Sequence, residues 1–121
     1  MQDQELIQQI AKSLYERKAD NIVVLKVAHL TVLCDYMVIA SGRSAAQVTA
    51  LSDYVDEIMA DAGISLRRSE GVNDGRWAVM DYGHIIVHIF HRDDRTYYNL
   101  DRLWNDGSNK VDLPFDQTVS D

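Results

Sequence analysis

Apolar positions recur with two periods along this 121-residue chain. Spacings of three and four residues predict a helix over residues 3–19, a second that begins at Ser44 and stops at Gly63, and a short last helix capped by Asp94. Apolar runs predict five strands, at residues 22–27, 36–40, 64–69, 77–82 and 85–91. This order predicts one α/β (α+β) domain, a mixed five-stranded sheet with flanking helices packed against one side.

The segment from Glu70 to Phe90 is the most informative, because its two strands meet at a tight turn and predict an antiparallel hairpin. One face of the hairpin is apolar and of small to medium size, which suits packing under helices: Ala78, Met80, Tyr82, Ile85, Val87 and Ile89. The opposite face mixes aromatic, aliphatic and polar side chains: Trp77, Val79, Asp81, Ile86, His88 and Phe90. Burying an acid and a histidine without partners costs about 2–7 kcal/mol each. Since aromatic anchors among a few polar groups are typical of protein interfaces, we expect this second face to stay uncovered and to bind a partner.

Composition narrows the class of partner. Apolar residues make up 46% of the chain and the formal net charge is −7, so the chain has a globular composition and an acidic surface. Nucleic-acid binding needs clustered Lys and Arg, which are scarce here, and a basic protein is the better match. We see no secretion signal and no run of the ~20 apolar residues that span a bilayer. A single cysteine, Cys34, fits a reducing compartment, so we expect a cytoplasmic protein in which this thiol is an inert filler.

The end of the chain differs in character from the rest. From residue 106 onward it is polar and acidic, so we expect a domain over residues 1–105 followed by a flexible acidic tail over residues 106–121. The apolar residues Val111, Leu113 and Phe115 leave open the alternative of a short docking segment.

Three histidines near the hairpin do not form a metal site. His84 and His88 are four strand positions, or ~13 Å, apart, whereas zinc–nitrogen bonds are ~2.0–2.1 Å. His91 points to the face opposite His88. We therefore expect no metal and no cofactor.

Two further motifs resemble parts of enzymes. Ser41-Gly42-Arg43-Ser44 could cradle a phosphate, but it matches no phosphate-binding fingerprint and is more simply a helix entrance. Asp53 and Asp56 follow it as the metal-binding acids follow a Gly-Ser turn in nucleotidyltransferases. Those acids alternate on a strand, whereas these lie three apart on a helix. A magnesium-dependent nucleotide-binding enzyme remains an alternative to a non-enzymatic role.

The ordered motifs resemble the ribosomal silencing factor (RsfS, Iojap) family over roughly residues 3–105. The resemblance rests on residues 35–44 (DYMVIASGRS), Glu70-Gly71, Gly75, Trp77, Asp81-Tyr82-Gly83, residues 87–90 (VHIF) and the set Tyr97, Tyr98, Leu100, Leu103 and Trp104. It implies a nucleotidyltransferase-like fold without catalytic acids and a role that is not enzymatic. Family members bind ribosomal protein fourteen of the large subunit, block subunit joining and repress translation. Some act in large-subunit assembly, and free members are commonly homodimers.

The resemblance and the face analysis together give the expected partner-binding residues: Trp77, Val79, Asp81, Ile86, His88, Phe90 and Tyr98. Trp77 and Tyr98 would be apolar anchors, Asp81 would pair with a cation, and His88 would donate a hydrogen bond. His84 replaces the usual acid of the family and Arg43 a smaller polar residue. A dimeric scaffold, in which self-association uses up this face permanently, is the second alternative.

Overall fold

The computed structural model describes residues 3–115 and 117. Within them the chain forms the elements α1 (Asp3–Glu16), β1 (Asp20–Lys26), β2 (Tyr36–Gly42), α2 (Ala45–Asp61), β3 (Arg68–Glu70), β4 (Trp77–Asp81), β5 (Ile85–His91), α3 (Arg92–Tyr98) and α4 (Leu100–Trp104). The strands form one sheet in the order β1-β2-β5-β4-β3. β2 and β5 run parallel, and the other neighbours are antiparallel. The predicted mixed five-stranded sheet with flanking helices is confirmed.

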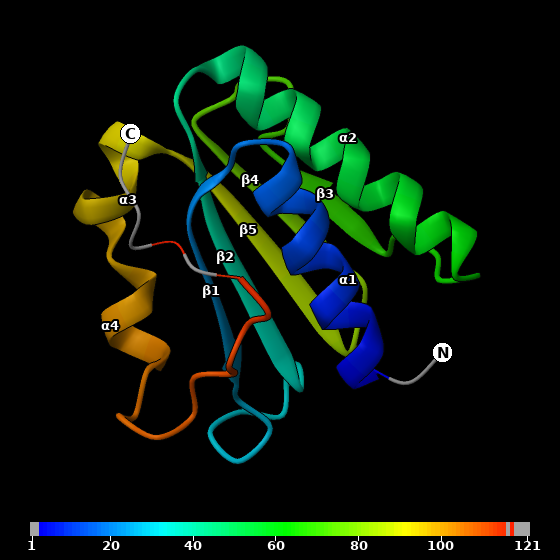
Figure 1. The fold of residues 1–121 in the computed structure, drawn as a ribbon, viewed down its shortest axis with the longest axis vertical. Coiled ribbons are helices and arrows are strands. Elements are labelled where there is room, and N and C mark those ends of the chain that lie inside the picture. Colours follow the sequence, from blue (N-terminus) through cyan, green and yellow to red (C-terminus); the bar gives the residue numbers. More distant parts are fainter. Residues whose placement is uncertain (1–2, 116, 118–121) are drawn as a thin grey trace.

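The helices lie on both sides of this sheet (Figure 1). α1 and α2 cover one face, while α3 and α4 stand against the other. The prediction that helices pack on one side only is therefore wrong for the end of the chain. The reason is the apolar pair Leu100 and Trp104, which packs on a second buried cluster beneath α4.

The main core lies between the sheet and the pair α1 and α2. It contains every hairpin residue predicted to face the helices, which confirms the alternation: Ala78, Met80, Tyr82, Ile85, Val87 and Ile89. α1 adds the apolar face that its sequence predicted, with Leu6, Ile7, Ile10, Ala11 and Leu14 buried. This core fixes which side of β4 and β5 faces away from α1 and α2.

The boundaries of α2 follow its predicted caps. The Ser44 hydroxyl accepts a hydrogen bond from the backbone N–H of Gln47 at 3.1 Å. The Gln47 side chain reaches back to the N–H of Arg43 at 2.6 Å, one residue earlier than in a standard capping box. At the other end Gly63 takes a positive φ of 78°, which glycine adopts without strain.

Several other boundaries differ from the prediction. α1 ends at Glu16 because Lys18 turns into the left-handed region with φ 72°. β2 continues through Gly42, which the sequence assigned to a turn. The predicted last helix is two short helices, since Asn99 between them has φ 50°. His91, and not Asp94, caps the first of them.

The described part of the C-terminal segment is packed against the domain. Val111, Leu113 and Phe115 alternate with exposed residues and pack on the main core, and Phe115 stacks on Tyr15 with ring centroids 4.3 Å apart. The backbone N–H of Val111 also donates to Val24 of β1 at 2.8 Å. The structure thus differs from the expected flexible tail and matches the docking alternative for residues 106–115 and 117. Residues 116 and 118–121 of the predicted tail lie outside the described residues.

No helix in the described part of the chain is long and apolar enough to cross a membrane.

Candidate partner-binding surface

The hairpin brings six of the seven predicted binding residues onto one face. β4 and β5 pair in register, so Trp77 lies opposite Phe90, Val79 opposite His88, and Asp81 opposite Ile86. Directly opposed side chains on one face of a sheet are close enough to touch. The seventh residue, Tyr98, reaches the same face from the end of α3 and contacts Trp77.

Three aromatic rings, those of Trp77, Phe90 and Tyr98, lie against one another on this face. The Trp77 ring lies 4.9 Å from Phe90 and 4.5 Å from Tyr98, centroid to centroid. Phe90 is fully buried, Trp77 is half-buried, and Tyr98 is 47% exposed. Phe90 therefore supports the other two rings from below and offers no surface to a partner, which corrects its predicted role as a direct contact.

His88 is more buried than the sequence suggested. The residue is only 7% exposed, and the Trp77 indole N–H donates to its Nδ1 at 3.1 Å. Burial lowers the pKa of His88 to about 4, so its ring is neutral at physiological pH. Its other nitrogen, Nε2, is buried and has no hydrogen-bond partner among the described residues.

A small pocket of about 220 Å³ opens beside His88. Its walls come from β2, β3, β4, β5, the β1–β2 connector and α4, and include Val79, Ile86, Leu33 and Trp104. The charged residues Arg68, Glu70 and Asp81 also line it. We call this the His88 pocket. Four of the predicted residues, Val79, Asp81, Ile86 and His88, thus line one hollow, and Trp77 is bonded to one of them.

Asp81 is held in place by its own turn. Its Oδ1 accepts a hydrogen bond from the backbone N–H of Gly83 at 2.8 Å. Gly83 has φ 93°, and a Cβ there would lie 2.8 Å from the Arg67 guanidinium carbon. The half-buried carboxylate therefore sits at a defined position beside the pocket.

The platform formed by α3 and α4 depends on one buried arginine. The Arg95 guanidinium donates to both Asp101 carboxylate oxygens at 3.0 and 2.7 Å, and to the Ser41 hydroxyl at 2.8 Å. These bonds join α3 to α4 and both to β2, and so position Tyr98. Arg95 and Asp101 are six residues apart, but Ser41 lies 54 residues before Arg95, so periodicity along the chain could not predict the complete network.

Two leucines outside the hairpin, which the sequence analysis did not predict to be exposed, have most of their surface accessible. Leu33, in the connector after β1, is 70% exposed, and Leu103 of α4 is equally exposed. Leu33 and Trp104 line the His88 pocket together. The sequence signal for Leu33 is the apolar character of the connector between β1 and β2, residues 28–34 (AHLTVLC).

Cys34 behaves as the sequence predicted. It is buried in the second cluster beside Met37 and Phe90. Burial raises the pKa of its thiol to about 11, with Asp35 and Asp81 adding to the effect. A thiol of this kind is a poor nucleophile at neutral pH.

The three hairpin histidines have separate partners. His84 lies 3.2 Å from Asp35, His88 bonds to Trp77, and His91 accepts from the N–H of Asp93. In residues 3–115 and 117, the group whose ligand atoms come within 4.8 Å of one another is Asp3, Asp35 and His84. It is largely exposed and already contains the His84–Asp35 pair, so absence of a metal remains a prediction.

Asp53 and Asp56, the two acids that a nucleotidyltransferase-like enzyme would use to bind metal, are engaged differently in this structure. Asp56 accepts a hydrogen bond from the Tyr82 hydroxyl at 2.8 Å, and Asp53 is exposed on the same helix. Neither belongs to the group that could hold a metal in the described part of the chain. The Ser41–Ser44 turn is occupied by the α2 cap and by the bond from Arg95.

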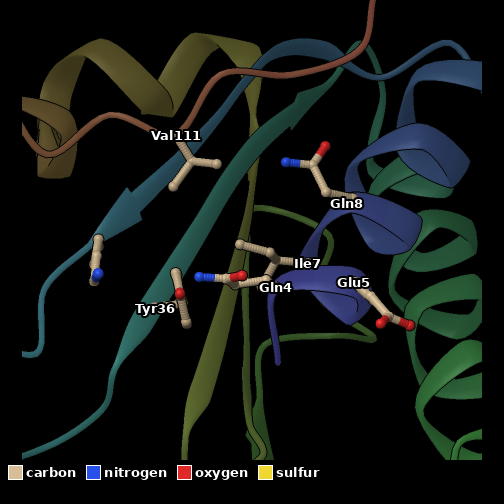
Figure 2. A pocket seen from close by; sticks show the side chains of 7 residues that line it. Gln4, Glu5, Ile7, Gln8, Tyr36 and Val111 are labelled. Atoms are coloured by element: carbon tan, nitrogen blue, oxygen red, sulfur yellow. The ribbon is translucent and has the colours of Figure 1, made fainter. Parts of the chain in front are cut away.

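A larger hollow lies on the other side of the sheet. It has a volume of about 630 Å³ and is lined by α1, β1, β2 and the C-terminal segment. Figure 2 shows Gln4, Ile7 and Gln8 of α1 on one side of it, with Tyr36 and Val111 across from them. It contains none of the predicted binding residues.

Comparisons with known proteins agree on one family. The model of the family described as "Ribosomal silencing factor during starvation" matches residues 1–121. The ribosomal silencing factor RsfS of Zymomonas mobilis is 38% identical over 94% of this chain and 85% of its own. That of Halalkalibacterium halodurans is 36% identical over 88% of this chain and 91% of its own. A crystal structure of a Chromobacterium violaceum protein superposes with a TM-score of 0.83 at 31% identity, covering 98% of this chain and 97% of that one.

Proposed function

Because this chain belongs to the family of ribosomal silencing factors, we propose that it binds the large ribosomal subunit through ribosomal protein fourteen, using the face of β4 and β5 turned away from α1 and α2. Bound at the intersubunit side, it excludes the small subunit sterically and represses translation. No bond is made or broken in this mechanism, so the role is regulatory.

The observation that carries this proposal is the cluster of three aromatic rings formed by Trp77, Phe90 and Tyr98. Trp77 and Tyr98 present partly exposed rings above a fully buried Phe90. Aromatic side chains with rigid backing are the residues that most often dominate binding energy at protein interfaces. The exposed Leu33, which lines the His88 pocket, adds apolar area on this side of the sheet.

Charge supports a basic partner. The chain carries a formal net charge of −7, and two carboxylates, Glu70 and Asp81, line the His88 pocket. Complementary charge speeds encounter with a cationic surface and disfavours wrong partners. Asp81, fixed by its bond to Gly83, is the side chain that we expect to pair with a cation.

The free protein, on this proposal, forms a weak homodimer in the cytoplasm that uses part of the same face. Dimerisation would then compete with ribosome binding, and adding large subunits would dissociate the dimer. Sedimentation equilibrium over a range of protein concentrations, with and without large subunits, measures this competition.

The enzyme alternative predicts nucleotide binding. Calorimetry with ATP and CTP in the presence of Mg²⁺ should give no heat of binding on our account. Binding that disappears on changing Asp53 or Asp56 to Asn would favour the enzyme.

The proposed function is tested by sedimentation of the tagged protein with separated ribosomal subunits through a sucrose gradient. We expect it to travel with the large subunit and not with the small one. Lys12→Ala, a change on an exposed part of α1 remote from the hairpin, should behave as wild type. Wild-type protein that stays at the top of the gradient would overturn the proposal.

A further inference from the structure

The Nε2 atom of His88 is buried and has no hydrogen-bond partner among the described residues, so it could donate a hydrogen bond to a group of another molecule. We infer that His88 Nε2–H is a recognition donor, which binds an uncharged hydrogen-bond acceptor that the partner inserts into the His88 pocket. This inference rests on the proposed function, and it adds the chemistry of the group that the pocket takes.

The position of the proton follows from Trp77. An indole N–H can only donate, so the Nδ1 atom that receives it must carry a lone pair. In a neutral imidazole the single proton is then on Nε2. Trp77 therefore acts on His88 as a positioning residue: it fixes both the ring orientation and the tautomer.

A buried donor without an acceptor is unfavourable, and folded proteins retain few of them. Here the donor belongs to a residue that is 7% exposed and that lines a pocket. The lining includes the apolar side chains of Val79, Ile86 and Met37. The polar residues of the same pocket, Arg68, Ser69, Glu70 and Asp81, make no hydrogen bond to Nε2.

The size of the pocket limits what can enter. At about 220 Å³ it is smaller than the ~300–1,000 Å³ typical of small-molecule sites. It suits one or two protein side chains or a short piece of main chain. The occupant is therefore a projecting segment of a protein partner.

The charges around the pocket select the kind of acceptor. Glu70 and Asp81 line it, opposed by the single cation Arg68. This excess of negative charge disfavours a carboxylate, so the acceptor is a hydroxyl, an amide or a main-chain carbonyl. A Lys or Arg next to that acceptor would pair with Asp81, consistent with a basic partner.

The first test is the tautomer itself, measured on the free wild-type protein. Nitrogen-15 chemical shifts of the His88 ring should show a protonated Nε2 and an unprotonated Nδ1. Trp77→Phe, which keeps an aromatic ring but removes the indole N–H, should yield a mixture of tautomers. A ring protonated on Nδ1 in wild type would overturn the inference without touching the proposed function.

The second test compares two His88 variants in binding to purified large subunits. His88→Phe keeps a ring but has no donor, and we expect about tenfold weaker binding. His88→Gln carries an amide N–H near the position of Nε2, and we expect it to recover at least threefold of that loss. Thermal unfolding of each variant shows that the domain is folded at the assay temperature.

The outcomes separate the two proposals. If wild type and Lys12→Ala bind and His88→Phe binds equally well, the recognition role of His88 is wrong and the proposed function stands. If His88→Phe and His88→Gln are weakened equally, the ring matters for packing and not as a donor, which also overturns the inference. If wild type binds no large subunit, the proposed function fails, and the inference fails with it.

Discussion

At the scale of residues, Trp77 is in contact with three other residues of the proposed binding face. Its ring stacks on Phe90, touches Tyr98, and donates its N–H to His88. It remains half-buried, so part of the ring faces outward. Such a side chain loses little conformational freedom on binding, because its neighbours already hold it in place.

Truncating this residue should have a large effect on binding. A central aromatic anchor contributes at least about 2 kcal/mol, so Trp77→Ala should weaken large-subunit binding about thirtyfold or more. Quantitative co-sedimentation measures the change, with Lys12→Ala as the matched control. A Trp77→Ala protein that is folded and binds as tightly as wild type would show that the anchor lies elsewhere.

A second prediction concerns the pH dependence of the free energy of unfolding, to which the buried His88 should contribute. Its pKa is about 4 in the folded protein and about 6.5 when exposed, so between these values the unfolded chain binds more protons than the folded one. Stability therefore falls as pH drops from about 6.5 to about 4, by about 2–3 kcal/mol from this group.

The comparison with His88→Phe isolates that contribution. Urea unfolding at several pH values from 4 to 7.5 should show a steeper loss of stability toward acid in wild type than in the variant. The three other histidines are present in both proteins and cancel. Parallel curves for the two proteins would mean that His88 is not buried in its neutral form.

At the scale of elements, the C-terminal segment contributes to the fold instead of trailing from it. The Asn109 side chain donates to the backbone carbonyls of Lys26 and Trp104, which joins β1 to the end of α4. Phe115 stacks on Tyr15 of α1. The segment therefore links the two helical layers that stand on opposite faces of the sheet.

Removing residues 106–121 should lower the free energy of unfolding by about 2–4 kcal/mol, because three partly buried apolar side chains and their backbone bonds are lost. Phe115→Ala alone should cost about 1 kcal/mol. Denaturant unfolding followed by circular dichroism measures both. If the shortened chain unfolds at the same denaturant concentration as the full one, the packing of this segment contributes nothing.

The elements also show what periodicity can and cannot predict. The hairpin faces were predicted correctly because alternation along a strand depends only on local geometry. The bond from Arg95 to Ser41 was missed because it joins segments 54 residues apart. The break at Asn99 was missed because periodicity does not predict a single left-handed residue. Docking of Phe115 was left open as an alternative, because its partner Tyr15 lies near the other end of the chain. Alternation along the strands correctly predicted that Trp77 and His88 share one face. It could not predict the hydrogen bond between their side chains, because that bond depends on side-chain orientation.

At the scale of the whole molecule, the second helical layer leaves part of the sheet accessible. α3 and α4 stand against one part of the sheet, and the His88 pocket remains open between α4, the β1–β2 connector and the hairpin. Trp77 and Tyr98 lie next to it. This arrangement gives a compact apolar site within an acidic molecule, which suits a small projecting region on a basic protein.

The most direct measurement of the central claim is joining of purified ribosomal subunits, followed by light scattering while the protein is titrated onto the large subunit. We predict that the joined fraction falls in proportion to the occupancy of the large subunit, and that Trp77→Ala restores joining at the same protein concentration. Full occupancy of the large subunit by wild type, with joining unchanged, would contradict the steric mechanism.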